Sequence, residues 1–269
     1  MNLPPSSARG NPFSALLGPL CAALISCGNP NEEQLSLSET TITYRLDWDT
    51  TGASQNDTGA WTWQSDLGFN IELTGGYLVT YSLQLVECRT NGLASWRHWL
   101  QELLGPRAAF AGHPHTQRNP AAMTPPHVES LLNPRAQHAG SAIAPAATYC
   151  QSHYLIAGAP PQAKGLPEDV NMLGTSLYLQ GHYQAPDSPE WVRFKIHSAL
   201  PNGVLTPLVP PGDSTAPVEV ETTSLTLTTS RSLATLLNGV DFTTMDTHAI
   251  QRQVLTSIIT ETRTHYSIP

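Results

Sequence analysis

The chain has 269 residues, a formal net charge of −8 at pH 7 and only 13% charged residues. This acidic balance argues against nucleic-acid binding, which needs a basic surface, and against a polybasic membrane-binding face. Without its N-terminal 26 residues the chain would number roughly 240, enough for one large β domain or two small ones. We expect a single domain over residues 39–269.

An apolar run at residues 13–25 follows a short N-terminal region that carries Arg9. The run has the length of the hydrophobic part of a signal peptide and is too short to span a bilayer. It ends in Leu-Ile-Ser-Cys-Gly at 24–28, which resembles the lipobox of bacterial lipoproteins. In that family the chain is cleaved just before the cysteine, which carries diacylglycerol and an acylated amine. The resemblance implies a signal peptide at 1–26 and lipidation of Cys27.

The residue after this cysteine implies a destination. An aspartate there marks retention in the inner membrane of enterobacteria, whereas this chain has Gly28. The resemblance therefore implies an outer-membrane lipoprotein, facing either the periplasm or the cell exterior, with the acyl chains as its only membrane anchor. The polar stretch 27–38 would be a tether between lipid and domain.

Alternating apolar and polar residues predict a first strand around residues 42–48. Residues 50–59 have the composition of a turn. Two or three strands are expected between residues 60 and 88, interrupted by a glycine-containing break at 74–76. After the break we expect Val79, Tyr81, Leu83 and Leu85 to face the core.

The pattern changes between Cys88 and Cys150. Apolar spacing predicts a short helix over 93–104, ended by Gly105, and the rest of 89–149 is rich in Pro, Ala, His and Asn. We therefore expect a loop without regular strands, and loops this long are usually functional or disordered. In an oxidising envelope Cys88 and Cys150 should form a disulfide at its two ends, worth roughly 4 kcal/mol. Two separate buried thiols are the alternative.

Strands are expected again at 149–159, 174–184 and 191–200, followed by a proline-rich connection at 201–217. A strand pair or one bent strand should follow at 218–229, and residues 247–262 have helical apolar spacing. The chain is therefore predicted to be all-β: an antiparallel β-sandwich with a long disulfide-tied, His- and Pro-rich loop and one or two peripheral helices. A β-barrel is the alternative.

Half of the ten histidines lie in the long loop. His113 and His115 flank Pro114, which favours an extended backbone, so both imidazoles would project to the same side. Imidazole pairs suit copper or zinc, but a tight zinc site has three or four ligands. The expected additional ligands are His98, His127, His138 and His153. The alternative is a solvated loop without metal.

The tripeptide Trp96-Arg97-His98 is similar to an element of copper-repressible, surface-associated copper-binding proteins of methanotrophs. In that family an oxidised tryptophan and two histidines bind copper, which would assign Trp96 and His98 to such a site. Five other aromatic residues could instead form a stacking platform for sugars or another partner: Trp48, Trp61, Trp63, Tyr77 and Tyr81.

No local catalytic motif is present in the sequence, and we do not expect an enzyme. Two hypotheses remain. The first is an envelope lipoprotein that binds copper or zinc through the histidine-rich loop. The second is a metal-free surface lipoprotein that acts as a structural, partner-binding or carbohydrate-binding module.

Overall fold

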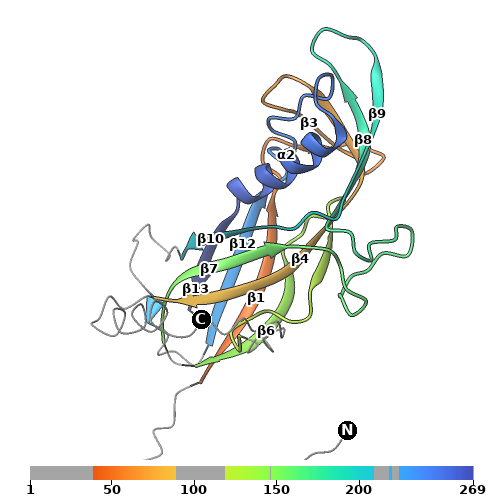
Figure 1. Ribbon diagram of the computed structural model, residues 1–269. Helices are drawn as coiled ribbons and strands as arrows, with labels where there is room; N and C mark the ends of the chain where they lie inside the picture. The colour runs from red at the N-terminus through yellow and green to blue at the C-terminus, as the bar shows by residue number, and fades with distance from the viewer. Residues whose placement is uncertain (1–38, 89–118, 146, 209–217, 220–223, 269) are drawn as a thin grey trace, which may run out of the picture. The chain divides into compact units, whose positions relative to one another are not determined.

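Strands dominate the part of the chain that the computed structural model describes, which comprises residues 39–88, 119–145, 147–208, 218–219 and 224–268 (Figure 1). The expected signal peptide, lipidation site and tether, all within residues 1–38, lie outside this part. So does the helix expected over 93–104.

The strands form two sheets. The smaller sheet has the order β13-β12-β1-β6. Its strands are β1 (Glu39–Asp49), β6 (Gln137–Pro145), β12 (Ser224–Ser232) and β13 (Arg263–Ser267). Its β1–β12 pair is parallel, a departure from the antiparallel expectation. Residues 50–223 separate these two strands, which is far more than the dozen or so residues that a crossover between parallel strands needs.

The larger sheet is built around the long strand β4 (Asn70–Glu87). One side of β4 pairs with β3 (Trp61–Gln64) and β5 (His127–Ser130), and the other side pairs with β7 (Thr148–Ile156) and β8 (Leu177–Gln184). The outlying strands are β2 (Ser54–Gln55), β9 (Trp191–Ser198), β10 (Asn202–Pro207) and β11 (Val218–Glu219). All pairs in this sheet are antiparallel.

The two sheets share one apolar core, which confirms the predicted all-β sandwich. Strand β1 alternates as expected, and Ile42, Tyr44 and Leu46 are fully buried. They belong to the same buried cluster as Leu83 and Leu85 of β4. The sandwich arises because each sheet has an apolar inner face that is buried against the other sheet.

The expected break at 74–76 is wrong, because β4 runs through it with a bulge at Thr74. A second bulge near Tyr81 changes which residues of β4 face inward. Thr80 is buried before it and Leu83 after it, while Tyr81 is 39% exposed. The expected alternation therefore holds only beyond the bulge. Val79 is also buried, but in a second small cluster.

The expectation of a strand-free loop over 89–149 is also wrong, since β5 and β6 lie in its second half. Strand β6 has the sequence Gln-His-Ala-Gly-Ser-Ala-Ile-Ala-Pro, which contains little that favours a strand locally. It is a strand because β1 offers it a long antiparallel ladder. The connection at 201–217 likewise contains β10, which pairs with β7.

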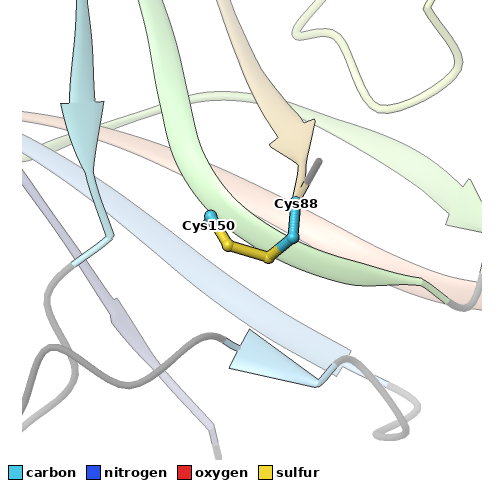
Figure 2. Close-up of a disulfide and its surroundings, with 2 residues drawn as sticks. All are labelled: Cys88 and Cys150. Carbon is cyan, nitrogen blue, oxygen red and sulfur yellow. A yellow bond between two sulfur atoms is a disulfide. The ribbon is translucent and has the colours of Figure 1, made fainter. Parts of the chain in front are cut away.

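The predicted disulfide between Cys88 and Cys150 is present (Figure 2). The two Cα atoms lie 5.0 Å apart, just beyond the end of the β4–β7 ladder at Glu87 and Tyr149. The main-chain N–H of Cys88 donates to the carbonyl of Thr148, so the bond closes the loop where two neighbouring strands already meet.

The C-terminal helix is confirmed as α2 (Thr247–Thr260). Asp246 caps it by accepting a hydrogen bond from the N–H of Ala249, and Val254 and Leu255 on its buried face join the core. No helix among the described residues is long and apolar enough to cross a membrane.

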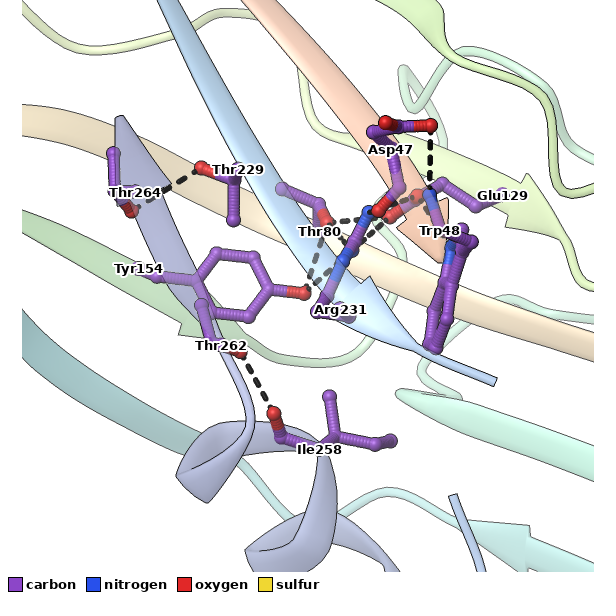
Figure 3. Close-up of polar contacts among 10 residues, drawn as sticks. All are labelled: Asp47, Trp48, Thr80, Glu129, Tyr154, Thr229, Arg231, Ile258, Thr262 and Thr264. Carbon is purple, nitrogen blue, oxygen red and sulfur yellow. Dashed lines mark hydrogen bonds and ion pairs between the residues drawn. The ribbon is translucent and has the colours of Figure 1, made fainter. Parts of the chain in front are cut away.

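A fully buried ion pair joins the two sheets (Figure 3). Both terminal nitrogens of Arg231 on β12 donate to the carboxylate of Glu129 on β5, at 2.7 and 2.6 Å. Glu129 also accepts from Thr80 Oγ1 at 2.7 Å and from Trp48 Nε1 at 3.1 Å. Arg231 donates further to the hydroxyl of Tyr154 at 2.9 Å.

The guanidinium of Arg231 keeps its charge despite burial. Burial alone would lower the pKa of Arg231, but the Glu129 carboxylate and the hydrogen bonds raise it above its usual value. The guanidinium also lies 4.6 Å from the Trp48 ring centroid. Three side chains around the pair, those of Thr80, Trp48 and Tyr154, thus replace much of the water that its two charges have lost.

We predict that Arg231→Met will lower the free energy of unfolding by about 3–5 kcal/mol, because it leaves Glu129 as an uncompensated buried charge. The double variant Arg231→Met/Glu129→Leu should be more stable than the single one. Urea titration measures both, with Arg252→Met on the exposed side of α2 as the control. A single variant no less stable than this control would contradict the assignment.

Candidate functional site

The histidines expected to bind metal do not meet in the described part of the chain. His113 and His115 lie outside it, as do Trp96 and His98. The other three candidates lie on separate strands: His127 on β5, His138 on β6 and His153 on β7.

The strand register keeps these three apart. His127 pairs with Thr80 and His153 with Gln84, on opposite sides of β4 and four positions apart along it. That offset is about 13 Å, whereas metal–nitrogen bonds are about 2 Å long. His138 belongs to the other sheet. The described residues contain no group of three or more potential metal ligands, so the metal hypothesis now depends on His113 and His115.

Of these three histidines, His153 and His138 each lie within hydrogen-bonding distance of another side chain. His153 Nδ1 lies 3.1 Å from Gln84 Nε2, and His138 Nε2 lies 3.3 Å from Ser141 Oγ. Nδ1 of His127 is buried without a hydrogen-bond partner among the described residues.

The five aromatic residues considered as a stacking platform do not form one surface. Trp48 and Trp63 are buried in the core, and Trp61 packs against it. Tyr81 lies exposed at the bulge of β4. Tyr77 packs against the second small cluster, where its ring centroid is 6.4 Å from that of the buried Tyr178.

Two hollows adjoin at Lys195 on the outer face of the larger sheet, and we call them together the β8–β9 groove. The first has a volume of about 470 Å³ and the second about 310 Å³. The first is lined by Thr74, Gln180, Gly181, His182, Arg193, Phe194 and Lys195. The second is lined by Asp169, Val170, Asn171, Tyr178, Lys195 and His197.

Strand alternation places the charged side chains in this groove. On β9, Phe194 and Ile196 point into the core, whereas Arg193, Lys195 and His197 are exposed on the opposite face. The antiparallel register sets them across from His182, Gln180 and Tyr178 of β8, respectively. A bulge in β4 allows Gln180 to lie over Gly75, where a Cβ atom would come within 2.7 Å of its side chain.

Local contacts position several groups in the groove. Lys195 Nζ lies 5.2 Å from the Tyr178 ring centroid, a cation–π contact. The Tyr178 hydroxyl donates to Gln180 Oε1 at 2.6 Å, and the Tyr77 hydroxyl donates to Asp169 Oδ1 at 3.0 Å. Burial raises the pKa of Tyr77, and the hydrogen bond to Asp169 raises it further by a smaller amount. This hydroxyl therefore remains a donor at neutral pH.

The carboxylates near the groove are already engaged, whereas its cations are open to solvent. Glu72 lies 3.2 Å from His182 Nδ1 and accepts from Asn56. Arg193 has no hydrogen bond or ion pair with any described residue. A planar guanidinium and a nearby ammonium are suited to bind a carboxylate or a phosphate. The groove can therefore bind a polar ligand that carries negative charge.

Comparisons with protein-family models, with characterised proteins and with solved structures find no match for this chain. Function is therefore inferred from its own residues. Sequence reasoning predicted β9 but missed its role in a site. The available signal was the placement of two of only 13 basic residues, Arg193 and Lys195, on one face of a strand.

Proposed function

We propose that this protein is a lipid-anchored binding protein of a bacterial outer membrane, and that its β8–β9 groove holds an anionic, polar partner. One observation carries the binding role: Arg193 and Lys195 project together into an open groove of a chain whose net charge is −8. The surrounding negative charge disfavours anions elsewhere on the surface, so the groove is where an anionic partner gains most.

The groove also contains neutral polar groups that would orient a bound ligand. Gln180 and Asn171 contribute amide groups that both donate and accept hydrogen bonds. The contact with Tyr178 restricts the ammonium of Lys195, which lowers the entropy lost when it binds a ligand. Charge would bring the partner to the groove, and the amides would orient it.

The anchor supports a partner near the membrane. The lipobox-like sequence at 24–28 supports lipidation of Cys27, and the domain begins at β1 only twelve residues later. A fully extended stretch of this length spans at most about 40 Å. The anchor would keep the domain at the membrane, so the partner of the groove would be a component of the envelope.

We predict that Cys27→Ala will release the protein from the membrane fraction, because the proposed acyl group is its anchor. Detergent-phase partitioning and intact-mass measurement of wild type and variant test this. Cys88→Ala/Cys150→Ala is the control, since it removes cysteines without touching the proposed lipid site. Membrane retention of Cys27→Ala would contradict the anchor.

A photo-crosslinking residue introduced at Thr74 tests the groove in intact cells. Thr74 is exposed and lines the first hollow, so we expect an adduct of defined mass after illumination. The same residue at Leu205, which is 52% exposed on β10, should give none. Adding Arg193→Glu/Lys195→Glu should reduce the Thr74 adduct roughly tenfold or more, because charge-assisted hydrogen bonds are lost. Equal adducts at Thr74 and Leu205 would exclude a specific groove.

Metal binding through His113 and His115 is the second candidate function. The spacing of these two histidines around Pro114 supports it, because an extended backbone would project both imidazoles to the same side. Copper or zinc would be the metal, since both are bound well by imidazole. The site would be independent of the β8–β9 groove.

Calorimetric titration with Cu²⁺ or Zn²⁺ tests this second candidate. We predict about one ion per chain, with affinity reduced roughly tenfold or more in His113→Ala/His115→Ala and reduced at low pH, where protons compete for imidazole. His265→Ala, an exposed histidine on β13, should leave the affinity unchanged. A separate site at Trp96 and His98 would instead lose copper in Trp96→Phe. Equal weak binding by wild type and the double variant would exclude the metal function.

A further inference from the structure

Strand β9 is an edge strand. Its single strand neighbour among the described residues is β8, with which it pairs from Trp191 to Ser198, and it lies at the margin of the sheet (Figure 1). An edge strand has a row of main-chain N–H and C=O groups that point away from the sheet. In an antiparallel strand these groups belong to every second residue.

Two hydrogen bonds reveal which residues of β9 face the open edge. The carbonyl of Ser198 accepts from the N–H of Ser176 at 2.7 Å, so it points toward the β8 side. The carbonyl of His197 instead accepts from Gln251 Nε2 of α2 at 2.7 Å, so it points away from β8. By the two-residue repeat, the N–H and C=O groups of Lys195 and Arg193 face the same open edge.

The residues with open main-chain groups are also those with exposed cationic side chains. A strand added beside β9 would hydrogen bond with the main chain of Arg193 and Lys195 and would meet both charges on one face. Acidic side chains at alternate positions of that strand would lie next to both cations. Trp191, which is 49% exposed and on the same face, provides an apolar contact beside them.

A second copy of this chain fits the edge poorly. Residues directly opposite each other in an antiparallel pair lie on the same face of the sheet. Pairing β9 with another β9 therefore sets Lys195 opposite Lys195, or Arg193 opposite Lys195, in the two central registers. In both arrangements like charges lie opposite and repel each other. The charges that attract an acidic strand therefore oppose self-association.

We propose that the partner is a polypeptide whose extended, acidic segment adds to the sheet at β9, with alternate acidic residues over Arg193 and Lys195. This inference rests on the proposed binding function of the β8–β9 groove and specifies its partner. Main-chain hydrogen bonds supply affinity in this mode of recognition, and the alternate side chains supply specificity.

The test compares Lys195→Ala with Lys195→Pro in the full-length lipidated protein in neutral detergent. Both variants lose the charge, but only proline also removes the N–H that faces the open edge, and it leaves the pairing with β8 intact. The probe is a synthetic peptide in which glutamate alternates with threonine, followed by fluorescence anisotropy. We expect roughly tenfold weaker binding for Lys195→Ala and a further loss of about tenfold for Lys195→Pro.

If urea titration shows that the proline variant is unstable, reversing the two charges provides a second test. Arg193→Glu/Lys195→Glu should reject the glutamate peptide and bind one in which lysine alternates with threonine. Equal affinities of Lys195→Ala and Lys195→Pro, with both proteins folded, would overturn strand addition. Binding of polygalacturonate but not of the peptide would also overturn it, and would leave the anion-binding groove standing. If neither probe binds wild type, the proposed function fails as well.

Discussion

The Arg231–Glu129 ion pair is the interaction on which the packing of the two sheets depends, because it crosses the core between them. Each charge would be costly alone in this interior, so the sheets must approach in the one arrangement that brings Arg231 to Glu129. A second polar cluster acts nearby, where the hydroxyls of Ser152, Thr206 and Thr264 hydrogen bond between the sheets. Apolar burial supplies the driving force, and these polar contacts restrict the register.

Strand β4 connects this core to the candidate site. Its C-terminal half contributes Thr80 to the ion-pair network and Leu83 to the core. Its N-terminal half forms one wall of the β8–β9 groove, where Gly75 makes room for Gln180. The bulges let one strand serve both regions, because each changes the face to which the following residues point. The groove is therefore supported by the same ladder that holds the core.

The charges on β9 combine two roles. Exposed edge strands are prone to join one another, and cations there prevent it. In this chain those cations also line an open groove, while the nearby carboxylate of Glu72 is held by His182 and that of Asp169 by Tyr77. An edge that repels its own copy and retains unpaired positive charge is suited to a partner of opposite charge. The proposed lipid anchor would keep the protein among the envelope components from which such a partner would come.

The sequence by itself determined the features that depend on local periodicity and on the number of cysteines left in the mature chain. Alternation predicted β1, helical spacing predicted α2, and the two cysteines that remain after the signal and the lipobox predicted the disulfide. The same alternation, continued along β12, would have placed Arg231 on an inward face. Its partner Glu129 could not be found this way, because β5 is a strand only through its pairing with β4.

Only the tertiary structure decided the rest. Strand β6 forms on the ladder that β1 provides, the bulges of β4 reassign its faces, and the register of β8 with β9 assembles the groove. Period-two patterns identify the two faces of a strand but not its neighbours, so residues from distant segments meet only when the sheets are built.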